Sequence, residues 1–359
     1  MKRLVTIQKI AIVLITIVIV VCCLTYNYET SPVDKKSDEL ISFEVTEKQT
    51  LSTLGSSLKE ANLIHSEMFY KIYIKLHNIT SLQAGVYELS PNMSLKEITD
   101  VLTSGSTYNP NIVKITFKEG YNFRKFIKLI TENTDISESD IKETLKDEEY
   151  LDELIQKYYF LTDDIKNEKI YYALEGYLYP NTYELDKTWN IKKIFELMLD
   201  ETSKKLEPYK KEFENNEYSI HEIMTLASIV ELEGANSNDR NGIAGVFYNR
   251  LENGWSLGSD VTTYYAVGID FNERDLYQSE LDDYNAYNTR SSKMAGRLPV
   301  GPICNPSINS IEAALNPTKS NYFYFVADKN KKTYFSKTYS EHSKTINKLK
   351  SENLWYEYN

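Results

Sequence analysis

The most strongly patterned segment of the chain is an apolar run close to its N-terminus. Residues 10–28, "IAIVLITIVIVVCCLTYNY", contain no charged side chain, and a helix needs roughly 20 mostly apolar residues to cross a bilayer. A cleaved signal peptide is the alternative, but no small-x-small cleavage site follows the run. Lipid attachment at Cys22 is disfavoured because the bulky Val21 precedes it. We therefore predict a retained transmembrane helix over residues 10–28.

Charges on either side of this run predict its orientation. Lys2, Arg3 and Lys9 precede it, whereas residues 29–39 are mixed to acidic. Positive flanks stay in the cytoplasm, so we expect residues 1–9 to be cytoplasmic and the rest of the chain beyond the span to be extracytoplasmic. Residues 29–40 are polar with one proline and predict a short linker.

The next region alternates between the two periods of regular secondary structure. Its apolar residues recur every second position in two segments and at helical spacing in three others, and Ser94 with Glu97 forms a capping box before the last helix, which Gly105 would end. The predicted elements are a strand over 41–45, helices over 51–58 and 66–76, a strand over 84–90 and a helix over 94–105. This order predicts a small β-α-α-β-α subdomain over 41–105, for which a plain spacer is the alternative.

A longer mixed region follows a boundary at residues 106–112. Alternation predicts a strand at 113–117, and the segment 131–156 is rich in charge at helical spacing, as expected for a solvated helical face. Near the C-terminus two aromatic segments flank a turn at 329–331 and predict a hairpin, followed by a helix over 340–349. The predicted fold class is α+β, with a larger domain over 112–359.

Composition narrows the classes of function. The 359 residues carry a net charge of −11, which argues against a nucleic-acid backbone as the main partner, because that needs a basic footprint. The four histidines and three cysteines show no zinc-ligand or disulfide spacing; Thr225 stands four residues after His221, where a zinc protease has its second histidine. We expect no metal, no cofactor, and a buried Cys304 that acts as a small hydrophobe.

Candidate chemistry lies in the segment "LASIVELEG" at residues 226–234. Ser219 and Glu222 form a capping box, which predicts a helix from about residue 220 toward Gly234. At about 100° per residue, Glu231 falls within an arc of apolar side chains, and Glu233 falls on the other flank beside Glu222.

A carboxyl group among aliphatic side chains is expected to have a raised pKa, because burial disfavours its charged form. A general acid for glycoside cleavage near neutral pH needs that property. An ion pair between Glu231 and an arginine, Arg240 or Arg250, is the alternative without chemistry, and spacing alone leaves it open. Uncharged, proline-braced loops rich in tyrosine and asparagine accompany this helix and suit sugar rings.

Several ordered motifs carry a resemblance to a known family. They are "LEGYLYPNTYEL" at 174–185, "LASIVELEG", "VFYNRL" at 246–251, "SDVT" at 259–262, "YNT" at 287–289, "LPVGPICNPS" at 298–307, "YFYFVAD" at 322–328 and "EHSKT" at 341–345. The chain resembles the endolytic murein transglycosylases, the MltG or YceG-like family, over nearly its whole length. The resemblance implies that the subdomain at 41–105 is LysM-like and precedes a YceG-like catalytic domain.

The resemblance also implies a reaction and its residues. Glu231 would be the catalytic acid and base: it protonates the glycosidic oxygen between N-acetylmuramic acid and N-acetylglucosamine, and the muramoyl C6 hydroxyl closes onto C1 to leave a 1,6-anhydro end. Such cleavage would terminate the elongation of nascent glycan strands. Residues implied to contact or support substrate are Glu175, Asn249, Asp260, Tyr287 and Asn288. Peptidoglycan strands would be the substrate, and peptidoglycan synthases or the elongation or division machinery the protein partners.

Two other functions remain to be separated from this one. A muramidase would hydrolyse the same bond with Glu231 and Asp260 as its two carboxylates, and a noncatalytic scaffold would only hold glycan. The chain also departs from the family pattern at Arg290, where tyrosine is usual, and at Thr333, where many members have histidine. These departures leave the cleavage position open more than the reaction type.

Overall fold

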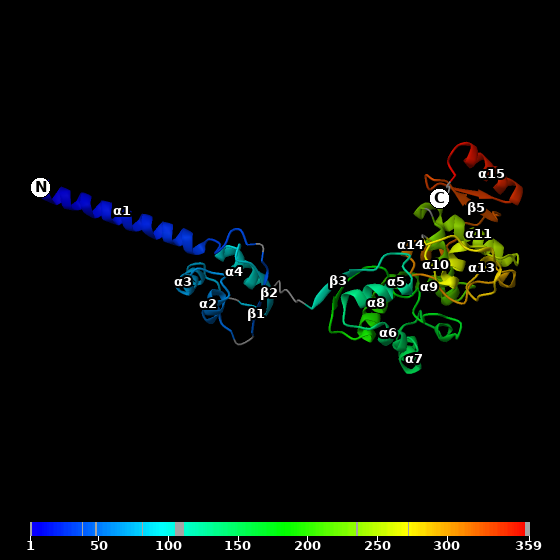
Figure 1. Ribbon diagram of the computed structural model, residues 1–359, viewed down its shortest axis with the longest axis horizontal. Coiled ribbons are helices and arrows are strands. Elements are labelled where there is room, and N and C mark those ends of the chain that lie inside the picture. The colour runs from blue at the N-terminus through cyan, green and yellow to red at the C-terminus, as the bar shows by residue number, and fades with distance from the viewer. Residues whose placement is uncertain are drawn as a thin grey trace. The chain divides into compact units, whose positions relative to one another are not determined.

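A computed structural model describes residues 2–37, 39–46, 49–80, 82–104, 111–234, 236–271 and 273–355. The chain divides into two compact units, Met1–Ile112 and Val113–Asn359 (Figure 1). Both units combine helices with short strands, so the predicted α+β class is confirmed. Residues 106–110 of the predicted boundary at 106–112 lie outside the described residues.

The first unit begins with the helix α1 (Lys2–Thr30). Its segment Ile12–Thr30 is long and apolar enough to cross a membrane, a property that an anchor and a signal sequence share. The apolar side chains of Ile12, Leu14 and Val18 are more than half exposed. The predicted apolar helix is therefore present, and its role as a retained anchor stays a prediction.

The remainder of the first unit has the predicted order of elements. β1 (Ile41–Val45) pairs antiparallel with β2 (Gly85–Leu89), and the helices are α2 (Leu51–Glu60), α3 (Glu67–Leu76) and α4 (Leu95–Ser104). These elements enclose a core of their own. The predicted capping box of α4 is formed, with the Ser94 backbone N–H donating to Glu97 Oε2 at 2.7 Å. Gly105, the predicted helix stop, lies outside the described residues, and the LysM-like assignment stays a prediction.

The second unit opens with a helical region built around a pair of short strands. β3 (Ile112–Thr116) pairs with β4 (Thr182–Asp186). The helices of this region are α5 (Phe123–Asn133), α6 (Glu138–Thr144), α7 (Glu148–Lys157), the 3-10 helix η1 (Asp163–Lys166) and α8 (Ile191–Leu206), followed by η2 (Glu207–Tyr209) and α9 (Lys210–Glu214). The charged segment 131–156 therefore holds the end of α5, all of α6 and most of α7, whose apolar sides enter the core, rather than one solvated face.

The centre of the second unit is the helix α10 (Ile220–Glu233), which packs against α11 (Arg240–Glu252) and α14 (Ile308–Leu315). Its predicted capping box is formed between Ser219 and Glu222. Every residue from Ile223 to Val230 is buried. The expectation of an apolar arc opposite a polar flank is therefore wrong for the middle of α10, because neighbouring elements cover all of its sides.

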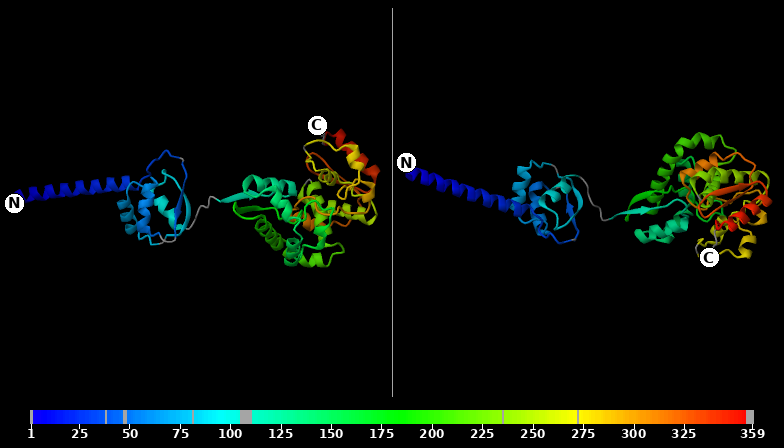
Figure 2. Two further views of the ribbon diagram at one scale, coloured as in Figure 1. Left: turned by 60° about the horizontal axis from the view of Figure 1, so that its bottom comes forward. Right: turned by 90° about the horizontal axis from the view of Figure 1, so that it is seen from above.

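Shorter elements complete the unit: η3 (Ser237–Asp239), α12 (Asp260–Val267), α13 (Gln278–Asp282) and η4 (Ser292–Met294). The predicted C-terminal hairpin is confirmed as β5 (Tyr324–Ala327) and β6 (Thr333–Ser336), which pair antiparallel. The helix α15 (Tyr339–Ser351) packs on this hairpin, as Figure 2 shows in both views.

Candidate functional site

Glu231, in the last turn of α10, is held by four hydrogen bonds. Arg240 Nη2 donates to its Oε1 at 2.8 Å. Its Oε2 accepts from the Ser307 backbone N–H at 2.9 Å, from Ser307 Oγ at 2.5 Å and from Ser310 Oγ at 2.8 Å. The Glu231 side chain is only 7% exposed. Both carboxylate oxygens therefore face donors, and one of those donors is a buried cation.

The donors around Glu231 belong to two different segments of the chain. Arg240 begins α11, and its Nη1 also donates to Ser307 Oγ at 2.8 Å. Ser307 is the N-cap of α14, so the Glu231 carboxylate lies against the positive end of that helix, a favourable place for an anion. The arginine pairing left open by the sequence is thus present with Arg240, whereas Arg250 donates instead to the carbonyls of Phe323 and Leu257.

Glu233, two residues further on, has different surroundings. Ser259 Oγ donates to its Oε1 at 2.5 Å, and this is the one hydrogen bond that the described residues give its carboxyl group. Burial raises the pKa of Glu233, and the nearby Asp260 charge raises it further. The Ser259 hydrogen bond, Arg290 and Arg250 oppose that rise. Glu233 is therefore a half-buried residue whose carboxyl group retains its proton to higher pH than usual.

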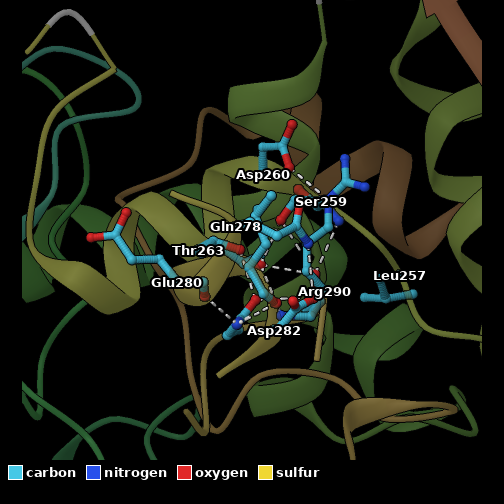
Figure 3. Close-up of polar contacts among 12 residues, drawn as sticks. Leu257, Ser259, Asp260, Thr263, Gln278, Glu280, Asp282 and Arg290 are labelled. Carbon is cyan, nitrogen blue, oxygen red and sulfur yellow. Dashed lines mark hydrogen bonds and ion pairs between the residues drawn. The ribbon is translucent and has the colours of Figure 1, made fainter. Parts of the chain in front are cut away.

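Two motifs from separate parts of the sequence meet beside Glu233. The Ser259 backbone N–H donates to Thr289 Oγ1 at 3.1 Å, and Thr263 Oγ1 donates to the Asn288 side chain at 2.7 Å. Figure 3 shows this network, with Arg290 Nε donating to Asp260 Oδ1 at 2.6 Å. "SDVT" and "YNT" are therefore joined, and Ser259 is thereby placed to reach Glu233.

Two of the predicted substrate contacts are engaged with the protein itself. Asn288 is buried, and its Nδ2 donates to the carbonyl oxygens of Glu280, Leu281 and Asp283. Asn249 Nδ2 donates to the carbonyl oxygens of Ser320 and Tyr322. Both amides hold loops in place. Asp260 is different, because its side chain is 52% exposed beside Arg290 and lies near Glu233.

Glu175 and Tyr287 belong to a buried cluster rather than to this exposed site. Glu175 Oε2 accepts from the Phe123 backbone N–H at 2.9 Å and from the Tyr265 hydroxyl at 3.0 Å. Burial raises the pKa of Glu175 to about 8, which leaves the group mostly neutral at pH 7. Tyr287 is fully buried, and its ring lies 4.8 Å from that of Tyr265.

The motif "LPVGPICNPS" contacts α10, where Ser228 Oγ accepts from the Ile303 N–H at 3.0 Å, and it also contacts the chain just after β3 and just before β4. Asn305 Oδ1 accepts from the Leu178 N–H at 3.0 Å, and its carbonyl oxygen accepts from the Gly120 N–H at 2.9 Å. Gly176 has φ +86°, and a Cβ atom there would lie 2.3 Å from Pro302 Cβ, so this contact requires glycine. Cys304 is fully buried, as predicted, and burial holds the pKa of its thiol well above the ordinary value.

Several residues of the site were not singled out from the sequence. They are Ser259, Ser307 and Ser310. The first two stand inside motifs that the sequence analysis quotes, which is the signal that could have found them. Which glutamate each serine contacts depends on packing between distant segments, and sequence spacing does not predict that packing.

Known proteins of similar sequence identify the family of this chain. The sequence profile of the YceG-like family matches residues 43–348. The chain is 36% identical over 319 residues to the endolytic murein transglycosylase of Bacillus subtilis (strain 168), covering 88% of this chain and 87% of that protein. It is 31% identical over 336 residues to the protein of the same name from Streptococcus pneumoniae serotype 2 (strain D39), of which it spans only 59%.

A solved structure agrees with the sequence comparisons. The crystal structure of a YceG-like protein from Listeria monocytogenes is 35% identical and matches with a TM-score of 0.60. The match covers 86% of this chain and the whole of that one. With the family profile spanning most of its length and relatives of this similarity, the chain belongs to the YceG-like family.

Proposed function

We propose that the chain is an endolytic peptidoglycan lytic transglycosylase, anchored by α1 with its N-terminus in the cytoplasm. It would cleave between N-acetylmuramic acid and N-acetylglucosamine in nascent strands and leave 1,6-anhydro ends that stop elongation. The observation that carries the proposal is a half-buried glutamate with a raised pKa at the end of α10, in a chain whose relatives are named endolytic murein transglycosylases. Peptidoglycan synthases or the division machinery are the partners that we expect from the resemblance.

The contacts favour Glu233 over Glu231 as the acid. A general acid must hold a proton at the working pH and present it to the substrate oxygen. Both oxygens of Glu231 are occupied by four hydrogen bonds from the protein, which leaves neither of them free for a substrate oxygen. Glu233 accepts one hydrogen bond among the described residues, and burial raises the pKa of its carboxyl group. We therefore assign proton transfer to Glu233, and to Glu231 the fixing of the helix end that carries it.

One carboxyl group, acting first as acid and then as base, is enough for this reaction. Protonated Glu233 gives its proton to the glycosidic oxygen as the bond from that oxygen to the muramoyl C1 breaks. The muramoyl C6 oxygen forms the new bond to C1 and releases its proton to the Glu233 carboxylate, which restores the acid without consuming water. Two-carboxylate hydrolysis would need a free second acid. Asp260, the second carboxylate that such hydrolysis would use, is paired with Arg290, which favours the route through the C6 hydroxyl.

Matched glutamine variants test the assignment. Purified full-length chains carrying Glu233→Gln or Glu231→Gln are incubated with uncrosslinked glycan strands, and the products are analysed by mass spectrometry. We expect Glu233→Gln to abolish formation of anhydro ends and Glu231→Gln to reduce it together with stability. Full activity of Glu233→Gln would refute the assignment, and loss of activity in Glu231→Gln at unchanged stability would return the role to Glu231.

Digestion in oxygen-18 water separates the reaction types. The anhydro route leaves the new end unlabelled, whereas hydrolysis places one heavy oxygen on it. Unchanged glycan after digestion by the parent chain would instead support a scaffold that only binds strands.

A further inference from the structure

Tyr171 is an exposed aromatic residue that is rigidly held, at 42% exposure. Its hydroxyl donates to the Ala266 carbonyl oxygen at 3.1 Å and accepts from Asn285 Nδ2 at 2.7 Å. Its ring packs against the rings of Tyr265 and Tyr287, with centroids 5.7 and 4.8 Å away. A ring fixed on one side and open on the other costs little ordering entropy when a ligand stacks on it.

A hollow of about 650 Å³ begins at this tyrosine. Its wall includes Tyr172, and the charged side chains that line it are Lys142, Lys146, Lys166, Glu148 and Glu168. Lys142 is paired with Glu138, and Lys166 with Asp152 and Asp163. Lys146 is exposed and takes part in none of the ion pairs of the described residues. Within the described residues Lys146 is therefore a free ammonium group in a hollow that also holds two carboxylates, so it can pair with a single carboxylate of a ligand.

A second hollow, of about 580 Å³, adjoins the tyrosine on the side of α13. Ala266 and Asn285, the two residues that bond the Tyr171 hydroxyl, both line it. Ser279, Asp282 and Asp283 also line this hollow and are exposed. Hydroxyl and carboxylate groups of this kind suit the hydroxyl-rich edges of a sugar.

We propose that Tyr171 and the two hollows beside it form a distal binding subsite for the peptidoglycan strand. One sugar ring stacks on the open face of Tyr171, neighbouring sugar hydroxyls bond to Ser279 and the Asp282 and Asp283 carboxylates, and a stem-peptide carboxylate is drawn toward Lys146. This inference rests on the proposed function and adds to it a place where the strand is held away from the point of cleavage.

The helix α12 fixes the separation of the subsite from Glu233. Asp260, at its first turn, lies near Glu233, and Ala266, in its last turn, bonds Tyr171. Six residues at 1.5 Å per residue place these ends about 9 Å apart along the axis, a separation on the scale of a disaccharide. A strand bound at both places extends beyond the cleaved bond, which is the geometry required for cutting within a strand.

Binding by the uncleaving chain tests the subsite. The full-length Glu233→Gln chain in detergent is titrated with fluorescently labelled uncrosslinked glycan strands, with and without stem peptides. Adding Tyr171→Ala should weaken binding about five- to tenfold, the effect of losing one aromatic stacking contact. Tyr171→Phe should retain most of the affinity, and Tyr339→Ala, a tyrosine 69% exposed on α15, should retain all of it. Lys146→Gln should weaken only the binding of strands that carry stem peptides.

The outcomes are separable. Unchanged affinity in Tyr171→Ala, or an equal loss in Tyr339→Ala, would overturn the stacking site, and Lys146→Gln decides the matter if Tyr171→Ala unfolds. If Glu233→Gln still cleaves strands, the titration is run in the chain that also carries Glu231→Gln, so a failure of Glu233 as the acid leaves the subsite result intact. A parent chain that binds no strand at all would refute both proposals.

Discussion

Replacing Arg240 with alanine should strongly destabilise the second unit. The substitution leaves the Glu231 carboxylate without its cation, and the two side chains are only 11% and 7% exposed. Removing one partner of a buried pair costs roughly 3–5 kcal/mol, because the other charge stays buried and uncompensated. At ~2–4 °C per kcal/mol for a domain of this size, the midpoint of thermal unfolding should fall by about 10 °C.

Arg290→Ala provides the matched control. Arg290 pairs with Asp260 at 2.6 Å, a shorter distance than the 2.8 Å between Arg240 and Glu231. The Arg290 and Asp260 side chains are, however, 42% and 52% exposed. An exposed pair contributes about 0–1 kcal/mol, so its loss should move the midpoint by roughly 4 °C or less. Thermal unfolding followed by circular dichroism measures both variants. Equal shifts in the two variants would refute the reasoning, since burial is the variable that separates them.

Three further outcomes are expected. Because Glu233 must be protonated to act, activity should fall as pH rises through its pKa. Asp260→Asn removes a negative charge that raises this pKa, so it should move the alkaline limb of the kcat/KM profile to lower pH. Arg290→Ala removes a positive charge that lowers the same pKa, so it should move that limb to higher pH. Glu175 has a folded-state pKa of about 8 against 4.5 for the free group, so the folded protein keeps a proton that the unfolded chain loses, and stability should decline between about pH 4.5 and pH 8. Glu175→Gln should remove that decline in denaturant titrations run across this pH range. A decline of unchanged slope would contradict the burial of a neutral acid. Gly176→Ala should lower the free energy of unfolding by about 2 kcal/mol or more, because its φ of +86° and the 2.3 Å approach to Pro302 both exclude a Cβ atom. Gly254→Ala is the control: its φ is +71° but the space around it is open, so urea unfolding should show only the backbone part of that loss.

Local sequence signals predicted the secondary structure well. The alternation in 41–45 and the capping boxes at Ser94 and Ser219 each depend on residues within a few positions of one another, and each element is present. The charged segment 131–156 was harder, because Ser137 and Asp147 begin new helices within it.

The site depended on contacts that no local pattern reports. Helical phase places Glu231 and Glu233 on different sides of α10, but it does not say that Arg240 and Ser307 close around the first while Ser259 reaches the second. Helical phase also predicts a polar flank, but α10 has none over Ile223–Val230 because neighbouring elements of the second unit cover all of its sides. Motifs identified the segments that meet, and packing determined which side chains they contribute.

The clamp on Glu231 has a consequence for the energetics of turnover. Ser307 and Arg240 tie the last turn of α10 to the starts of α14 and α11, each of which is itself packed. A terminal helical turn without such ties would fray, and a side chain on it would need to be immobilised each time substrate arrived. Here the entropy of that ordering is lost once, during folding, so the neighbouring Glu233 begins every cycle with its backbone already in position.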